Sequence, residues 1–215
     1  MKLSVVIPFY NEENMIQKMY DELVKEINQI TKAEFEIIFI NDGSKDRTFE
    51  RMLAIAAGDS RVKYISFSRN FGKEAGTIAG LEYATGEAVI LMDGDLQHPP
   101  AMLPQMIEAY EQGYDVVSAR RTRTGEKPHR TFLAKHFYKL ANKMMDIELM
   151  DGVSEFRLFS RKVVNAIISM QEYNRFSKGI FAWIGFNEKV IEYENQVRTV
   201  GETKYSLKFS LNYAI

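Results

Sequence analysis

Short apolar runs alternate along the chain with longer segments in which apolar residues recur every three or four positions. The short runs LSVVIP, FEIIFI, VKYISF, AVILM and DVVSA begin at residues 3, 35, 62, 88 and 115. Runs of this length that are apolar at successive positions predict strands buried on both faces. The intervals between them are long enough for the crossover helices that parallel strands require.

Helical periodicity supports this interpretation. Two of the intervening segments place their apolar residues on one helical face. These residues are Met15, Ile16, Met19, Tyr20, Leu23, Val24, Ile27 and Ile30 in the first segment, and Phe49, Met52, Leu53 and Ala56 in the second. Buried strands joined by helices predict an α/β fold, with a mostly parallel central sheet flanked by helices on both faces.

Composition limits the function classes. With 215 residues and 46% apolar content, the chain suffices for one core, so a single domain over 1–215 is expected. A formal charge of -1 gives no overall attraction to nucleic acid or to a membrane. The absence of cysteine excludes disulfides, thiolate metal sites and a cysteine nucleophile. The longest apolar run, GIFAWIGF, is too short to span a bilayer.

Polar residues follow every predicted strand. Ligands bind at the carboxyl ends of the strands in such sheets, so these exits are the candidate site. The exits read PFYNEE, NDGSKD, SRNFGKEAG, DGDLQHPP and RRTRTGEKPHR. For NDGSKD alone, a turn followed by a helix cap is the simpler interpretation.

The fourth exit carries more charge than a turn needs. In an extended segment Asp93 and Asp95 would face the same side. Two carboxylates without a His or Cys cluster favour a hard divalent cation, Mg²⁺ or Mn²⁺, which leaves positions open for substrate phosphates. His98 is either a further ligand or a capping residue that supports the site. No phosphate-loop or dinucleotide-binding glycine motif is present, so phosphates must be held in another way.

The fifth exit is strongly basic. It contains Arg120, Arg121, Arg123, Lys127, Arg130 and Lys135. The run lacks the interleaved aromatic residues of a single-strand nucleic-acid binder, and a phosphate-bearing acceptor explains it better. A phosphate monoester is largely ionised near neutral pH, so it can attack without a general base but must be positioned by cations. A hydroxyl acceptor would instead need a well-placed carboxylate base.

The first four exit motifs, in this order and at these intervals, resemble the inverting family 2 glycosyltransferases with the GT-A fold. The strings SEFRLFSR and VRTVGETKYS resemble the polyprenyl-phosphate subgroup, which includes dolichol-phosphate mannose synthases and bactoprenol glucosyltransferases. The resemblance covers essentially the whole chain. It implies a nucleotide-sugar-binding half over 1–119, an acceptor-binding half over 120–204 and the start of a juxtamembrane helix over 205–215.

The resemblance also implies roles for individual residues. Those assigned to the nucleotide are Pro8, Tyr10, Glu12, Asp42, Asn70, Lys73 and Asp93. Each has a structural alternative: Pro8 can end a strand, Tyr10 can pack in the core, and Glu12 can be a first-turn helix acid. Asn70 and Lys73 can simply precede a capped helix.

For the metal, the catalytic groups and the acceptor, the resemblance implies further assignments. The metal residues would be Asp93, Asp95 and Gln97; the catalytic residues Asp95, Glu155 and Arg157; the acceptor-phosphate residues Arg120, Arg123 and Arg130; and the residues of a loop closing over the diphosphate Arg198 and Lys204. Glu155 replaces the usual Asp of the family, which leaves open whether it acts as a base or orients Arg157. Ala134 replaces a small hydroxyl residue. Arg198 and Lys204 can also belong to a turn before a last helix.

The aromatic residues Phe181, Trp183 and Phe186 are expected to be core, because aromatic side chains bury large areas.

The expected activity is transfer of a hexosyl unit from a nucleotide diphosphate sugar, UDP-glucose first and GDP-mannose second, to polyprenyl phosphate. The expected location is the cytoplasmic face of a membrane, with transmembrane helices beyond residue 215. Whether the protein forms a homo-oligomer is left open. The alternatives are a family 2 transferase acting on a hydroxyl of a polysaccharide or glycolipid, and a nucleotide-sugar-binding module without catalysis.

Overall fold

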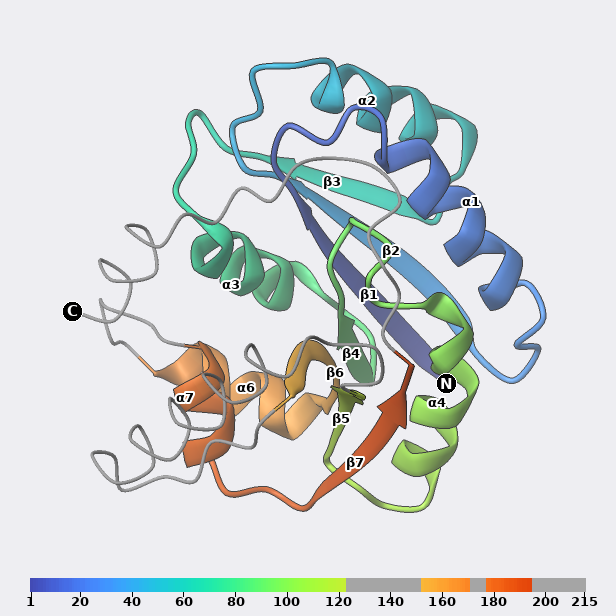
Figure 1. Cartoon of the computed structure of the whole chain (residues 1–215), viewed down its shortest axis with the longest axis vertical. Coiled ribbons are helices and arrows are strands. Elements are labelled where there is room, and N and C mark those ends of the chain that lie inside the picture. The colour runs from blue at the N-terminus through green and yellow to red at the C-terminus, as the bar shows by residue number, and fades with distance from the viewer. Residues whose placement is uncertain (123–151, 171–176, 195–215) are drawn as a thin grey trace.

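The protein is built around one seven-stranded sheet (Figure 1). The computed structural model describes residues 1–122, 152–170 and 177–194. The strands are β1 (Lys2–Phe9), β2 (Glu34–Asn41), β3 (Val62–Ser66), β4 (Ala88–Leu91), β5 (Val116–Arg121), β6 (Val153–Ser160) and β7 (Glu188–Tyr193). Their order across the sheet is β3-β2-β1-β4-β6-β5-β7. Only β6 runs against the others, since it pairs antiparallel with both β4 and β5, so the predicted mostly parallel sheet is confirmed.

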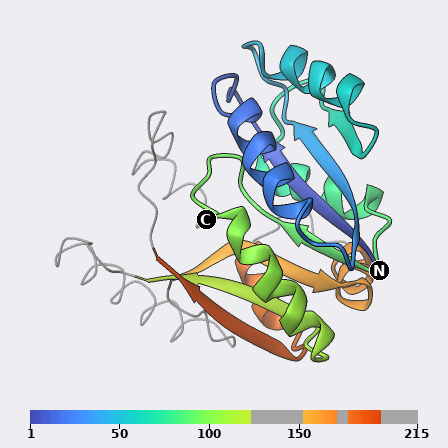
Figure 2. The same ribbon diagram turned by 90° about the vertical axis from the view of Figure 1, so that its right-hand side faces the viewer.

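Helices cover both faces of the sheet (Figures 1 and 2). One face carries α1 (Ile16–Ile27), α2 (Thr48–Gly58), the short 3-10 helix η1 (Pro100–Met102) and α4 (Leu103–Glu111), and the other carries α3 (Lys73–Tyr83), α6 (Arg161–Ser169) and α7 (Ser177–Trp183). The two helices predicted from periodicity are therefore confirmed as α1 and α2. Within the ranges that the structure describes, no helix is both long enough and apolar enough to cross a bilayer.

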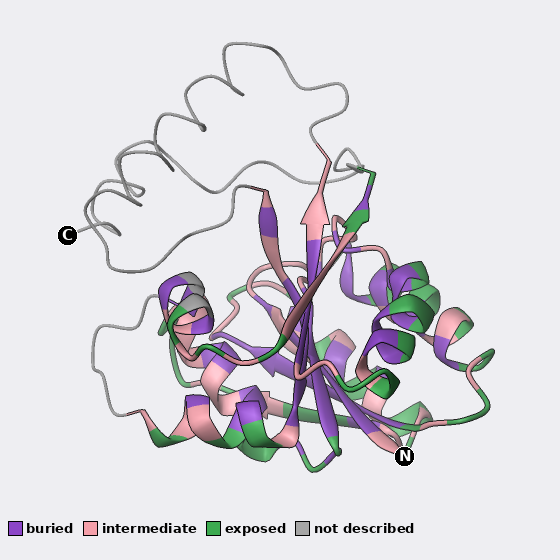
Figure 3. Ribbon diagram, turned by 90° about the horizontal axis from the view of Figure 1, so that it is seen from below, coloured by how far each residue is buried: buried purple, intermediate pink, exposed green. Residues whose placement is uncertain are grey.

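The strands separate two apolar layers, because successive side chains of a strand point to opposite faces. In β1, Leu3, Val5 and Ile7 pack toward α1, and Val6 packs toward α3. Figure 3 shows the buried strands running between helices whose outer sides are exposed. The near-continuous apolar runs of the sequence thus reflect burial on both faces.

Helix α3 lies unusually close to the sheet. A Cβ on Gly80 would lie 2.2 Å from Cγ1 of Val6, so only glycine permits this approach. The close packing fixes where α3 begins, which matters because its first residue, Lys73, lies at the candidate site.

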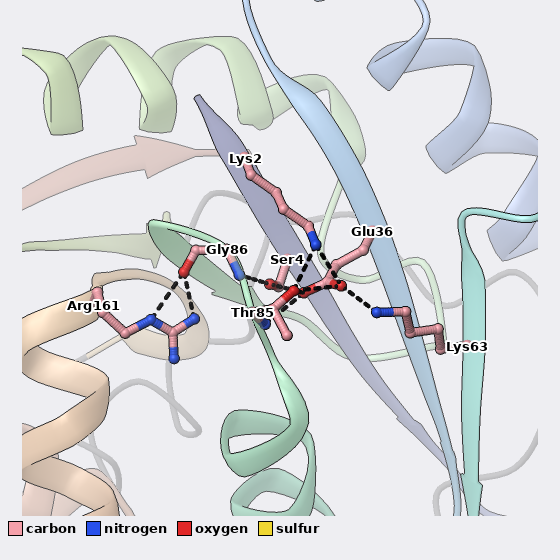
Figure 4. A network of polar contacts seen from close by, with 7 residues as sticks. All are labelled: Lys2, Ser4, Glu36, Lys63, Thr85, Gly86 and Arg161. Atoms are coloured by element: carbon pink, nitrogen blue, oxygen red, sulfur yellow. Dashed lines mark hydrogen bonds and ion pairs between the residues drawn. The ribbon is translucent and has the colours of Figure 1, made fainter.

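The amino ends of the strands carry a buried polar cluster, far along the strands from the candidate site (Figure 4). The Glu36 carboxylate accepts hydrogen bonds from Ser4 Oγ at 2.6 Å and from the backbone N–H of Thr85 at 2.6 Å. Lys63 Nζ lies 2.7 Å from it and Lys2 Nζ 3.3 Å. Desolvation would raise the pKa of Glu36, but these donors outweigh it and lower that pKa far below its ordinary value.

One expectation about the core is wrong. Phe181 is buried against Phe159, whereas Trp183 at the end of α7 is 66% exposed. Both lie on one short helix, but only the residue that faces the sheet can use its area for packing. The large apolar area of tryptophan was therefore no guide to its place here.

Candidate active site

The candidate site lies at the carboxyl rim of the sheet, where β1, β2, β4 and β5 end. Because β6 is reversed, it begins at this rim. Leu91, the last residue of β4, pairs with Arg157 of β6. Asp93 lies two residues after Leu91, and Glu155 lies two residues before Arg157. The register therefore places Asp93 opposite Glu155, on the sheet face that α3 covers. The register of this antiparallel pair thus brings two carboxylates together.

A lysine joins these carboxylates. Nζ of Lys73 lies 2.5 Å from Oδ1 of Asp93 and 2.6 Å from Oε2 of Glu155. The three side chains are partly exposed, between 18% and 31%. Desolvation disfavours the ammonium, but the two carboxylates outweigh this effect and raise the pKa of Lys73. Lys73 therefore stays charged at any physiological pH.

The turn after β4 is tightly packed. A Cβ on Gly94 would lie 2.3 Å from Cε1 of Phe9, and Leu96 adopts a left-handed conformation with φ 61°. The expectation of an extended segment through Asp95 is wrong, because the chain turns at Gly94 and Asp95. Asp95 Oδ1 accepts the backbone N–H of Gln97 at 3.1 Å. Strain of this kind is typical of functional turns.

His98 supports this turn. It is buried, and its Nδ1 accepts the backbone N–H of Asp93 at 2.9 Å. Its ring stacks on Phe156, with centroids 5.2 Å apart and planes inclined by 16°. Desolvation lowers the pKa of His98, which favours the neutral ring that this hydrogen bond requires. Of the two roles considered for His98, the structure favours the supporting one.

The donor atoms at the turn fit a hard divalent cation. Asp93, Asp95 and Gln97 offer carboxylate and amide oxygens, the ligands that Mg²⁺ and Mn²⁺ prefer. The described part of the chain contains no cluster of three or more His, Cys, Asp or Glu side chains that could enclose a metal. An ion held by one or two carboxylates takes its remaining ligands from water and substrate phosphates, so the residues suit a substrate-assisted site.

The polar residues after β1 and β2 bind the rim loops to one another. Asn11, with φ 51°, accepts the backbone N–H of Lys45 at 2.8 Å, and its own N–H donates to Ser44 at 3.0 Å. The backbone N–H of Glu12 donates to Thr48 Oγ1 at 2.8 Å. The turn predicted for NDGSKD is present, since Asn41 Oδ1 accepts the backbone N–H of Ser44 at 3.0 Å. The predicted helix cap is not, because the residue that precedes α2, Arg47, makes no side-chain cap hydrogen bond.

Asp42 is nearly inaccessible. Its carboxylate accepts the backbone N–H groups of Phe71 at 2.7 Å and Gly72 at 3.0 Å. Desolvation outweighs these hydrogen bonds and raises the pKa of Asp42. Asp42 therefore fixes the loop that leads into α3, and whether it also contacts a nucleotide stays a prediction.

The remaining predicted nucleotide residues lie at the same rim. Pro8 lies in β1, two residues after Val6, whose carbonyl accepts the backbone N–H of Met92. Backbone groups two residues apart in a strand point to the same neighbouring strand, so the nitrogen of Pro8 faces the side of β4. The paired part of β4 ends at Leu91, so the missing N–H of Pro8 costs no ladder hydrogen bond. Tyr10 is half-buried after β1, and Asn70 is exposed before α3.

Arg157 is a buried cation with its own partners. Its Nη1 lies 3.3 Å from Oε1 of Glu188, and its guanidinium lies 5.2 Å from the Phe181 ring centroid. Desolvation lowers the pKa of Arg157. Sequence reasoning missed Glu188. The only signal was the general need of a buried arginine for a carboxylate, which does not say where that carboxylate lies in the chain.

Most of the residues assigned to the acceptor phosphate lie outside the part of the chain that the structure describes. Arg120, at the end of β5, forms an ion pair with Glu192 of β7, with Nη2 2.5 Å from Oε1. Arg123, Arg130, Arg198 and Lys204 lie outside the described residues. Their assignment to the acceptor and to a closing loop stays a prediction.

Comparison with known proteins identifies the family. The model for glycosyl transferase family 2 matches residues 4–168. The putative glycosyltransferase CsbB of Bacillus subtilis is 49% identical over 99% of this chain and 64% of its own length. A prophage bactoprenol glucosyl transferase homologue of Escherichia coli is 43% identical over 96% of this chain and 67% of its own length. The chain thus spans about two thirds of the length of these curated relatives.

A solved structure confirms the fold. Glucosyl-3-phosphoglycerate synthase of Mycobacterium tuberculosis, in complex with Mn²⁺ and UDP-glucose, superposes with a TM-score of 0.63 at 19% identity. The match covers 99% of this chain and 75% of the synthase. The match confirms the expected GT-A architecture. The rim carboxylates therefore lie on a glycosyltransferase scaffold, and the chain belongs to glycosyl transferase family 2.

Proposed function

We propose that this chain is the catalytic domain of an inverting transferase that moves a hexosyl unit from a nucleotide diphosphate sugar to polyprenyl phosphate. UDP-glucose is the preferred donor and GDP-mannose the second. The reaction would take place at the cytoplasmic face of a membrane. The observation that carries the proposal is the meeting of Asp93, Lys73 and Glu155 at the carboxyl rim, beside the turn that holds Asp95.

The comparisons support the choice of donor and acceptor. A relative 43% identical to this chain is named as a homologue of a bactoprenol glucosyl transferase, which indicates glucose and a polyprenyl acceptor. The structurally similar synthase was crystallised with Mn²⁺ and UDP-glucose. The basic run that begins with the last two residues of β5 favours an anionic acceptor on independent physical grounds.

In the proposed reaction, an oxygen of the lipid phosphate attacks the anomeric carbon from the side opposite the diphosphate. A new bond forms between that carbon and the phosphate oxygen, the bond to the diphosphate oxygen breaks, and the nucleoside diphosphate departs with the electron pair. No proton has to be removed from the ionised nucleophile. Residues Asp93, Asp95 and Gln97 would hold a divalent cation, which when bound supplies positive charge to the departing diphosphate.

Within this proposal the chain's own residues position the reactants. Asp42 fixes the loop before α3, and His98 fixes the turn that presents Asp93 and Asp95. Arg123 and Arg130 would hold the acceptor phosphate through paired N–H donors. Arg120 would join them by exchanging Glu192, to which its Nε and Nη2 donate, for the phosphate. Holding two reactants in line supplies much of the rate enhancement when no proton transfer is needed.

Transfer assays with purified protein test the proposal. We expect UDP-glucose, with Mg²⁺ or Mn²⁺, to glucosylate a short-chain polyprenyl phosphate in preference to oligosaccharides. Asp95→Asn should lower the rate by about 100-fold, as expected for loss of a group that stabilises transition-state charge. Asp21→Asn, at an exposed position of α1, is the matched control and should leave the rate unchanged.

Other outcomes identify the alternatives. Efficient transfer to oligosaccharide hydroxyls with indifference to the lipid phosphate would support a polysaccharide or glycolipid transferase. Metal-independent binding of UDP-glucose with neither transfer nor slow hydrolysis would support a binding module. Either result would reject the proposed reaction.

A further inference from the structure

The ammonium of Lys73 lies between carboxylates that come from distant parts of the chain. Lys73 is the first residue of α3, Asp93 follows β4, and Glu155 lies on β6. Its Nζ approaches Asp93 Oδ1 to 2.5 Å and Glu155 Oε2 to 2.6 Å. An ammonium has three donors and no acceptor, so it can bind both carboxylates at once.

The contact changes the charge that a metal ion would meet. Among the described side chains, Asp93, Asp95 and Glu155 bring three negative charges to this part of the rim, and Lys73, through its contacts with Asp93 and Glu155, offsets one of them. The neutral His98 ring adds none. Because Lys73 contacts Asp93 directly, a free divalent cation that approaches Asp93 is repelled by the ammonium or must displace it.

We infer that Lys73 is a positioning residue that acts as an internal counter-ion: it aligns Glu155 with Asp93 and opposes divalent ions that arrive without a nucleotide diphosphate. The inference rests on the proposed function of the rim as a donor site. A nucleotide diphosphate brings its own negative charge and oxygen ligands, which offset the repulsion by Lys73. Ion and nucleotide therefore bind with positive coupling, and each raises the affinity for the other by the same factor.

The role inferred from sequence resemblance makes a different prediction. If Lys73 acted only by contacting the nucleotide, its replacement would weaken nucleotide binding and leave the affinity for a free ion unchanged. If it is an internal counter-ion, its replacement strengthens the binding of a free ion. The affinity for Mn²⁺ in the absence of nucleotide separates the two roles.

Isothermal titration of the protein with Mn²⁺ alone, and again with saturating UDP, provides the measurement. Lys73→Met removes the charge and keeps the length of the side chain. We expect it to bind Mn²⁺ without nucleotide about tenfold more tightly than the wild type, which corresponds to about 1.4 kcal/mol. The coupling between Mn²⁺ and UDP should fall by a similar factor. Lys18→Met, on the exposed side of α1, makes the same change in net charge and should behave as wild type.

Two further variants keep the test decisive if Lys73→Met does not fold. Glu155→Gln leaves Lys73 with less compensation, so Mn²⁺ without nucleotide should bind about fivefold more weakly. Lys73→Arg retains the charge and should retain the low affinity for the free ion. Unchanged or weaker Mn²⁺ binding by folded Lys73→Met, or unchanged or tighter binding by Glu155→Gln, would overturn the inference.

Failure of the inference differs from failure of the proposed function. If the wild type transfers glucose while Lys73→Met binds free Mn²⁺ like the wild type, only the inference is rejected. If no nucleotide sugar is turned over, the proposed function is rejected, and the Mn²⁺ titrations still report on Lys73.

Discussion

Replacing Glu36 should destabilise the protein strongly, although Glu36 lies at the end of the sheet opposite the candidate site. In Glu36→Ala, the buried hydroxyl of Ser4 and the backbone N–H of Thr85 lose their acceptor. An unsatisfied buried donor costs about 1–3 kcal/mol. Two such donors give an expected loss of about 2–6 kcal/mol in the free energy of unfolding, in the lower half of that range because the Thr85 N–H is only partly buried.

The lysines contribute much less to this total. Lys63 and Lys2 contact Glu36 but are 54% and 42% exposed, so water replaces the lost contacts. Exposed ion pairs are worth about 0–1 kcal/mol. Lys63→Met should therefore cost under about 1 kcal/mol, and the buried donors decide the effect of Glu36→Ala.

Urea unfolding followed by circular dichroism at pH 7 measures these differences. Glu34→Ala is the matched control, because Glu34 begins the same strand and is exposed. It should change the free energy of unfolding by at most about 0.5 kcal/mol. A loss below about 1 kcal/mol for Glu36→Ala, or an equal loss for Lys63→Met, would refute the reasoning.

The same residue predicts a pH dependence. The folded state lowers the pKa of Glu36, so its contribution is present above the ordinary glutamate pKa of about 4.3 and is lost as the pH falls toward the folded-state pKa. Glu36→Gln abolishes this titration. Between pH 5 and pH 3, roughly the upper part of that window, the wild type should therefore lose more stability than Glu36→Gln in the urea assay. Parallel losses in both proteins would contradict the assignment.

Two changes at the aspartate turn should separate packing from hydrogen bonding. Gly94→Ala places a Cβ 2.3 Å from Phe9, so we expect it to displace the turn. The glucosyl transfer rate should fall at least about tenfold, and the free energy of unfolding in urea should fall by about 1–3 kcal/mol. Full activity would show that the turn can shift without loss. His98→Phe keeps an aromatic ring but leaves the Asp93 N–H without its acceptor, so unfolding should become easier by about 1–3 kcal/mol; wild-type stability would mean that water or another group replaces His98.

The sequence predicted the part of the fold that repeats along the chain. The first five strands and the helices α1 and α2 are local patterns of apolar residues, and each was found where it was expected. Strand β6 was not predicted, because SEFRLFS was interpreted as a functional motif. Its insertion between β4 and β5, against their direction, depends on pairing between distant segments and cannot be deduced from periodicity.

At the candidate site, too, local features were predicted from the sequence and long-range contacts were not. The sequence predicted the rim position of Asp93 and Asp95, since it follows from a buried strand and the residues after it. The contact of Lys73 with Glu155 was not predicted, because it requires the register in which Leu91 pairs with Arg157. The pair of buried Arg157 and partly exposed Glu188 likewise joins β6 to β7, two strands that are not adjacent in the sheet.

The reversed direction of β6 bears on how related proteins can differ between β5 and β6. The chain leaves β5 and re-enters the sheet at neighbouring points, since the Arg121 N–H donates to the Gly152 carbonyl at 3.0 Å and Arg120 pairs with Val153. Doubling the length of chain inserted between two such fixed ends costs only about 0.6 kcal/mol in closure entropy. The length of the chain between these two points can therefore differ among relatives while the described sheet stays the same.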